Sequence, residues 1–157
     1  MHGRIMFWRD GAQLRPAELG RRPAEQLERP VELVVPYTNP ALSARALAAA
    51  VELARDLEAA VTLMAVHVLP YPSPLECQEG IRQRLEAELT AVARTSPAAI
   101  RVKLVFARNR ADAYIGLLRR QSLVVIGTKD RWWTTREQRL ARALMSSGHS
   151  VAVVKVK

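Results

Sequence analysis

The sequence predicts an α/β fold in which helices cover both faces of a five-stranded parallel sheet, so that the domain has three layers. Short apolar runs of strand length alternate along residues 31–157 with segments whose apolar residues recur at helical spacing. Strands that alternate with helices form parallel sheets, because right-handed crossovers leave few other arrangements. The composition agrees: a chain of 157 residues, 49% hydrophobic and 25% charged, is typical of a globular domain that buries its own core.

Residues 1–30 do not follow this alternation, and we expect them to form an N-terminal arm, with residues 31–157 as the domain. Pro16 and Pro23 each suit the first position of a short helical turn. Residues 5–8 form an apolar cluster that includes a Phe-Trp pair. Because such a pair is unfavourable in water, we expect it to dock on the domain or on a partner.

The first half of the domain contains two strands and the starts of two helices. Residues 31–35 form a nearly continuous apolar run, typical of a strand covered on both faces. Asn39 then suits the N-cap of a helix and Pro40 its first position. Residues 61–68 form the second strand, and residues 73–76 (Ser-Pro-Leu-Glu) match a capping box, which predicts a second helix beginning at this point.

The second half repeats the alternation. Residues 100–106 alternate apolar side chains with Arg101 and Lys103, as expected for a strand at a sheet edge. A helix is predicted over residues 111–118 and a buried strand over residues 123–127. The last two elements are a helix that starts at Thr134 or Thr135 and stops at Gly148, and a strand over residues 151–156.

Four segments carry a resemblance to a known family. Residues 34–47 are VVPYTNPALSARAL, an apolar strand followed by a proline, a short polar turn and an Ala-Leu pair. Residues 65–68 (AVHV), 123–127 (LVVIG) and 150–154 (SVAVV) supply further strands in the same order. This arrangement resembles the universal stress proteins over residues 31–157. The resemblance implies the strand order 3-2-1-4-5 and a binding or regulatory role connected with the stress response.

The nucleotide-binding motif of that family is degenerate in this chain. Its nucleotide-binding members carry an Asp after the first strand, and a Gly-x-x-Gly, nine further residues and Gly-Ser or Gly-Thr after the fourth. Glycines in such a loop let backbone amides approach phosphates. Here Gly127 matches the first glycine of the motif, but Asp130 replaces the second. Thr38 stands where the Asp is expected, and Glu137 and Gln138 stand where Gly-Ser is expected. We therefore expect no tight binding of ATP and no cofactor, and bound ATP or AMP is the disfavoured alternative.

A ligand of this fold would lie beyond the carboxyl ends of the strands. Lys129 and Arg131, with Arg136, make that rim positive. One hypothesis is a non-standard phosphate loop that binds another nucleotide or anion, with Trp132 or Trp133 stacking on a base. We favour the other hypothesis, that the two indoles fill the groove and the cations are solvated. The candidate ligand-binding residues are Thr38, Asn39, Val68, Gly127, Thr128, Lys129 and Arg131.

The charge is concentrated in one part of the chain. Of a net charge of +9, residues 99–157 carry thirteen Lys and Arg residues against three acids. This concentration of positive charge attracts an anionic ligand or an acidic protein partner. It is also expected of a basic surface that only keeps the protein in solution. Nucleic acid is a third and less favoured partner, because Arg108, Arg110 and the other basic residues come with no recognised binding motif.

The last strand offers a surface for assembly. As the edge of the sheet it could pair with the same strand of a second copy, as universal stress proteins commonly do. The residues expected at this homodimer interface are Val151, Val153, Val154 and Val156. The alternative is that residues 5–8 of the arm cover this edge.

Catalysis and metal binding find no support in the sequence. His2, His67 and His149 are far apart and lack the spacing of metal ligands. We interpret His67 as a hydrogen-bonded core residue and not as a base.

A single cysteine, Cys77, forms no internal disulfide, and neither a signal peptide nor a membrane-spanning run of about 18 apolar residues is found. We therefore expect a cytoplasmic, non-enzymatic protein that does not enter a membrane.

Overall fold

The computed structural model describes residues 5–9, 12–14, 32–75, 78–119, 122–129 and 136–156. Its strands are β1 (Ile5–Arg9), β2 (Ala12–Leu14), β3 (Glu32–Pro36), β4 (Ala60–Val68), β5 (Ile100–Ala107), β6 (Ser122–Lys129) and β7 (Ser150–Val156). Its helices are α3 (Pro40–Leu57), α4 (Glu79–Ala93), α5 (Arg110–Leu117) and α6 (Arg136–Ser146). Within the described ranges, no helix is both long and apolar enough to cross a membrane.

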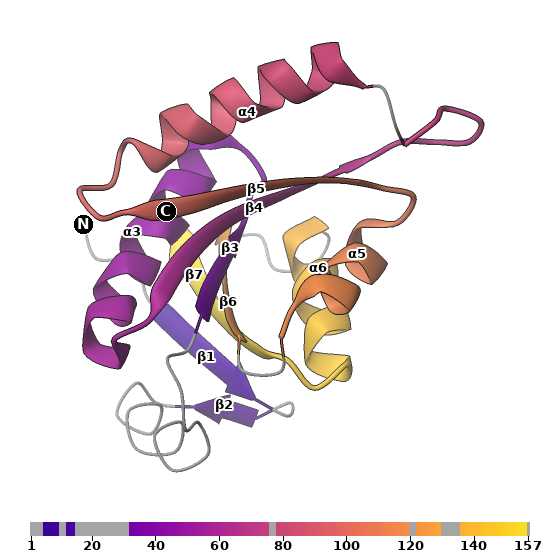
Figure 1. Ribbon diagram of the computed structural model, residues 1–157. Helices are drawn as coiled ribbons and strands as arrows, with labels where there is room; N and C mark the ends of the chain where they lie inside the picture. The colour runs from indigo at the N-terminus through magenta and orange to yellow at the C-terminus, as the bar shows by residue number, and fades with distance from the viewer. Residues whose placement is uncertain are drawn as a thin grey trace.

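The strands form one sheet in the order β2-β1-β7-β6-β3-β4-β5. The run from β7 to β5 is parallel throughout. Counted in chain order, these five strands have the order 3-2-1-4-5, so the predicted fold class and strand order are confirmed. Helices α3 and α4 lie on one face of the sheet, and α5 and α6 lie on the other (Figure 1).

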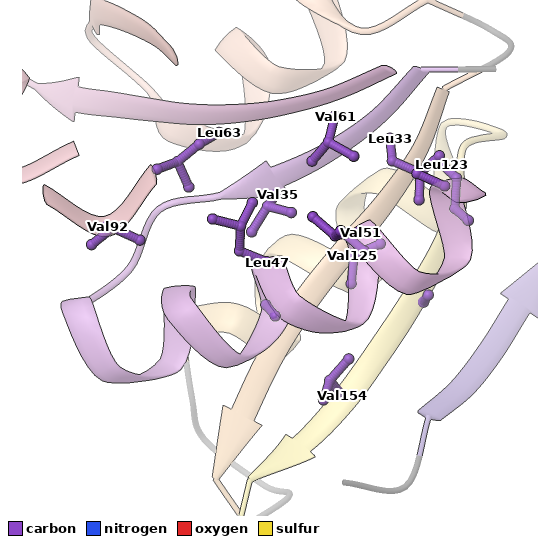
Figure 2. Close-up of a cluster of buried hydrophobic side chains, with 14 of the residues drawn as sticks. Leu33, Val35, Leu47, Val51, Val61, Leu63, Val92, Leu123, Val125 and Val154 are labelled. Atoms are coloured by element: carbon purple, nitrogen blue, oxygen red, sulfur yellow. The ribbon is translucent and has the colours of Figure 1, made fainter. Parts of the chain in front are cut away.

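Side chains that alternate along the strands separate two cores. In β3, Leu33 and Val35 point into the core beneath α3 and α4, while Val34 points into the core beneath α5 and α6. Figure 2 shows Leu47 and Val51 of α3 among the strand side chains of the first core. Burial on both faces explains why the central strands have nearly continuous apolar sequences.

The predicted start of α3 is confirmed. The Asn39 side chain accepts a hydrogen bond from the Leu42 N–H at 2.9 Å, and Pro40 takes the first helical position. The hydroxyl of Ser43 accepts a hydrogen bond from the Thr38 N–H at 3.0 Å. These two bonds fix the turn between β3 and α3, where two of the candidate ligand-binding residues lie.

The predicted start of α4 is wrong. The N–H of Ser73 donates to the carbonyl of Pro70 at 3.0 Å and closes a turn, so Ser73 does not head a helix. The helix begins only at Glu79, and its N-cap residue, Gln78, makes no capping bond with its side chain. Glu76, the last residue of the capping box, and Cys77 lie outside the described residues, as do Thr134 and Thr135 before α6. At the end of α6, Gly148 takes a φ of +85°, which fits the predicted stop.

The outer edge of β7 is not free. β1 pairs with it in antiparallel fashion, with Ile5 opposite Val154 and Trp8 opposite Val151, and β2 pairs with β1. The prediction that β7 is the edge of the sheet is therefore wrong, because the arm supplies a neighbouring strand, as in the alternative. The homodimer interface predicted at Val151, Val153, Val154 and Val156 stays a prediction. The helical turns expected at Pro16 and Pro23 lie outside the described residues.

Candidate functional site

A cavity of about 570 Å³ opens at the carboxyl ends of β3 and β4. It lies beside the boundary between β3 and β6, where the strand order reverses, which is the usual ligand site of an open parallel sheet. The turn after β3, the end of β4, and residues of α4, α5 and α6 form its walls. The lining residues are Tyr37, Thr38, Asn39, Pro40, Ala65, Val66, His67, Val68, Leu85, Glu88, Arg110, Arg136 and Glu137.

Charges of both signs line the cavity. Arg110 and Arg136 are the first residues of α5 and α6, where the partial positive charge of a helix end adds to that of the guanidinium group. The Arg110 guanidinium lies 5.8 Å from the centre of the Tyr114 ring. Glu88 and Glu137 bring carboxylates to the same cavity. The two arginines suit a small anion, while the two carboxylates oppose a ligand with several negative charges.

Tyr37 connects the end of β3 with α4. Its hydroxyl donates a hydrogen bond to Glu88 Oε2 at 3.2 Å. Burial, the negative charge of Glu88 and this hydrogen bond together raise the pKa of Tyr37 above its usual value. The phenol therefore stays protonated at neutral pH and can act as a donor in the cavity wall.

His67 is not the core residue that the sequence suggested. The residues at the carboxyl end of β4 are less buried than those in its middle, so His67 is half-buried and lines the cavity. Its ring meets Phe106 edge-to-face, with the ring centres 5.8 Å apart and an angle of 84°. The imidazole therefore presents an aromatic surface to the cavity, while the neighbouring Val66 faces the core beneath α5 and α6 on the other side of the strand.

Gly127 serves the packing of α3 against β6. A Cβ atom at this position would lie 2.8 Å from the carbonyl oxygen of Leu42 and 3.5 Å from Cβ of Ala46. The helix thus approaches the strand so closely that only a glycine fits. Gly127 does not line the cavity, and neither does Thr128, which is buried.

The candidate ligand-binding residues therefore separate into three groups. Thr38, Asn39 and Val68 come together in the cavity wall, as expected from their positions at strand ends. Gly127 and Thr128 lie in β6 outside that wall. The backbone of Lys129 pairs with that of Val156, but its side chain is outside the description, as are Arg131, Trp132 and Trp133.

Sequence reasoning missed Tyr37, Leu85 and Glu88 as site residues. Tyr37 directly follows β3, so its place in the chain was an available signal. Leu85 and Glu88 are three residues apart on α4 and thus share one face of that helix, but the sequence does not say where α4 crosses the sheet. Arg110 was assigned to a general basic surface, whereas it belongs to the cavity.

The loop after β4 is held by Arg108. Its Nη1 donates hydrogen bonds to the carbonyls of Leu69 at 3.1 Å and Pro70 at 3.0 Å. The guanidinium group stacks 4.1 Å from the centre of the Tyr71 ring, which is otherwise exposed. These contacts fix the backbone just beyond Val68, at one end of the cavity wall.

No protein-family model matches the chain, and a search of curated proteins finds no match. Solved structures do match. A universal stress protein from Archaeoglobus fulgidus has 15% sequence identity and a TM-score of 0.57, and the match covers 84% of this chain and 98% of that one. A universal stress protein from Archaeoglobus fulgidus in complex with dAMP has 14% identity and a TM-score of 0.54, with coverage of 81% and 98%. A universal stress protein in complex with cAMP has 17% identity and a TM-score of 0.52, with coverage of 81% and 97%. The chain thus has the fold of these proteins over its parallel sheet and helices.

Proposed function

We propose that this chain, built on the fold of the universal stress proteins, is a divergent regulatory domain of that type that acts in the stress response by binding and not by catalysis. Its ligand is a small molecule with one phosphate-sized anionic group, which occupies the cavity at the carboxyl ends of β3 and β4. The observation that carries the proposal is the placement of Arg110 and Arg136 in that cavity, at the first residues of two helices. We place the domain in the cytoplasm, because its single cysteine, Cys77, forms no internal disulfide.

The size and lining of the cavity support a mononucleotide-sized ligand. A volume of about 570 Å³ is within the range of small-molecule sites. The half-buried ring of His67 offers an aromatic surface for a flat base, and Val66 and Val68 offer apolar contacts on the other side of the strand. Two of the similar solved structures are complexes with cAMP and dAMP, each of which carries a single phosphate.

Tight binding of ATP is not supported. A triphosphate needs several backbone amides close to its oxygens, and glycines usually allow that approach. Here Gly127 faces the first turns of α3, and Glu88 and Glu137 stand in the cavity wall. Each further phosphate of a ligand would add repulsion from these carboxylates. The expected order of affinity is therefore a nucleoside monophosphate above ATP.

The test is isothermal titration of the protein with AMP, cAMP and ATP. We expect saturable binding of a monophosphate, weaker binding of ATP, and a loss of about tenfold or more with either Arg110→Gln or Arg136→Gln, since charge-assisted hydrogen bonds to phosphate are strong. Arg142→Gln is the matched control, because Arg142 is exposed on α6 and does not line the cavity. ATP binding as tight as AMP binding, or equal effects of all three variants, would contradict the proposal. Salt-sensitive retention on nucleic acid that survives both cavity variants would instead favour the basic surface as the binding site.

We also propose that two copies associate through β7. The strand is apolar on both of its faces, and a strand paired with its own copy gives a closed two-fold interface. This association requires the outer edge of β7 to be free of β1.

A further inference from the structure

The N-terminal hairpin occupies the edge that a second copy would need. β1 pairs with β7 over the register from Ile5 opposite Val154 to Trp8 opposite Val151. A two-fold ladder between two copies of β7 would use the backbone groups of residues 151–154 on the same side. One strand edge makes only one ladder, so the two arrangements exclude each other.

β7 is a strong template for pairing. Ala152 and Val154 pack in the core beneath α3, and Val151 and Val153 pack in the core beneath α6. All four are almost fully buried, so helices fix the strand in an extended form on both faces. A rigid apolar edge strand of this kind pairs readily with any strand that reaches it.

Among the described strands, the hairpin is attached to the rest of the sheet by a single ladder, between β1 and β7. β2 has β1 as its only neighbour in the sheet, and among the described elements β1 lies against β7 and β2. Separation of β1 from β7 therefore releases both short strands and leaves the parallel strands with all their other neighbours. Short terminal strands at the edge of a sheet belong to the less stable parts of a protein.

We propose that β1 is an internal competitor for the β7 edge, so that the N-terminal hairpin keeps the chain monomeric until it is released and a second copy of the chain takes its place. This inference rests on the proposed association through β7. Both copies must open before they pair, so the dimer weakens with the square of the open fraction. A hairpin that is open in one molecule in ten would weaken the dimer by about 100-fold.

Two variants in a Cys77→Ser background shift the competition in opposite directions. Met6→Cys with Val153→Cys places two cysteines directly opposite each other, and their disulfide would lock β1 on β7. Met6→Pro with Phe7→Pro removes backbone N–H donors from β1 and weakens its ladder. The reduced form of the first variant is the matched control for its oxidised form, because the two differ only in the disulfide.

The measurement is sedimentation velocity across a wide concentration range, with circular dichroism to establish that each variant is folded. We expect the oxidised variant to stay monomeric, its reduced form to behave as the parent, and the proline variant to dimerise at least tenfold more tightly than the parent. If the double proline variant does not fold, the single variant Phe7→Pro replaces it. If the disulfide abolished the dimer but the proline variant dimerised no more tightly than the parent, the competition would be overturned while the β7 dimer stood. Equal dimer constants in the locked, parent and proline proteins would overturn both, because a locked β1 leaves no free β7 edge. A folded proline variant that is monomeric at every concentration would overturn the β7 dimer itself, and the competition with it.

Discussion

Substitution of Gly127 by alanine separates a packing role from a phosphate-binding role at the one position that matches the family's glycine motif. The new Cβ would lie 2.8 Å from the carbonyl oxygen of Leu42, closer than real Cβ atoms approach another heavy atom. Because that oxygen belongs to the backbone, a change of the Leu42 side chain cannot relieve the contact. The first turns of α3 must instead move away from β6, and overpacking of this kind costs about 1–3 kcal/mol of unfolding free energy.

Urea denaturation followed by circular dichroism measures this loss, and Gly116→Ala is its matched control. Gly116 lies in α5, and a Cβ there has nothing within 4 Å, so alanine should stabilise the protein by about 0.5–1 kcal/mol through its better helix propensity. For a domain of this size, we expect thermal midpoints of the two variants on opposite sides of the parent, with Gly127→Ala lower by roughly 2–12 °C. A Gly127→Ala protein as stable as the parent, with a selective loss of ligand binding, would refute the packing explanation.

Two further predictions concern buried titratable groups. The Tyr114 hydroxyl donates to the carbonyl of Met64 at 2.9 Å, and burial raises the pKa of Tyr114 to about 12. Because the unfolded side chain loses its proton near pH 10, we expect stability to fall between about pH 10 and 12, and Tyr114→Phe to flatten this part of the profile while costing about 1 kcal/mol at neutral pH. Burial lowers the pKa of His149, so the unfolded state takes up a proton first, and stability should fall as the pH drops below about 6.5. His149→Asn should reduce that acid slope in urea titrations at several pH values, and an unchanged slope would show that other groups cause it.

The parallel core could be predicted because each of its signals is local. Continuous apolar runs mark strands that are covered on both faces, and the Asn39-Pro40 pair fixes the start of α3 within one residue. Gly148 marks the end of α6 in the same way. The right-handed crossover rule then leaves little freedom in how these elements assemble.

The two N-terminal strands could not be predicted, because they depend on a partner that is distant in sequence. β1 spans Ile5–Arg9 and β2 spans only Ala12–Leu14, and neither segment alternates apolar and polar residues clearly enough to predict a strand. β1 is extended because β7 offers it an edge, which is a tertiary cause. The capping box at Ser73 failed for the opposite reason: its local signal is clear, but the turn closed by the Pro70 carbonyl takes precedence.

The residues of the cavity wall also differ in what determines their positions: the order of the strands places some of them, and the packing of a helix on the sheet places others. Thr38, Asn39 and Val68 were predicted because residues that follow parallel strands gather at one edge of the sheet. Glu88 was not predicted as a site residue, because its position depends on how α4 crosses β4 and β5. The periodicity of a helix predicts which of its faces is buried, but not where the helix lies over the sheet.

A glycine that matches one position of a motif is weak evidence for the ligand of that motif. The close approach of α3 requires a glycine at Gly127 whether or not a phosphate is bound, since a Cβ there meets the backbone of Leu42. The match would therefore persist in a chain that had lost phosphate binding altogether, and it cannot count in favour of ATP. Arg136 has no comparable explanation in the packing of the core, because it is exposed, and Arg110 is half-buried and contacts the core only through the ring of Tyr114. The identity of the ligand thus depends on Arg110 and Arg136, and their substitution is more decisive for binding than any change in the loop after β6.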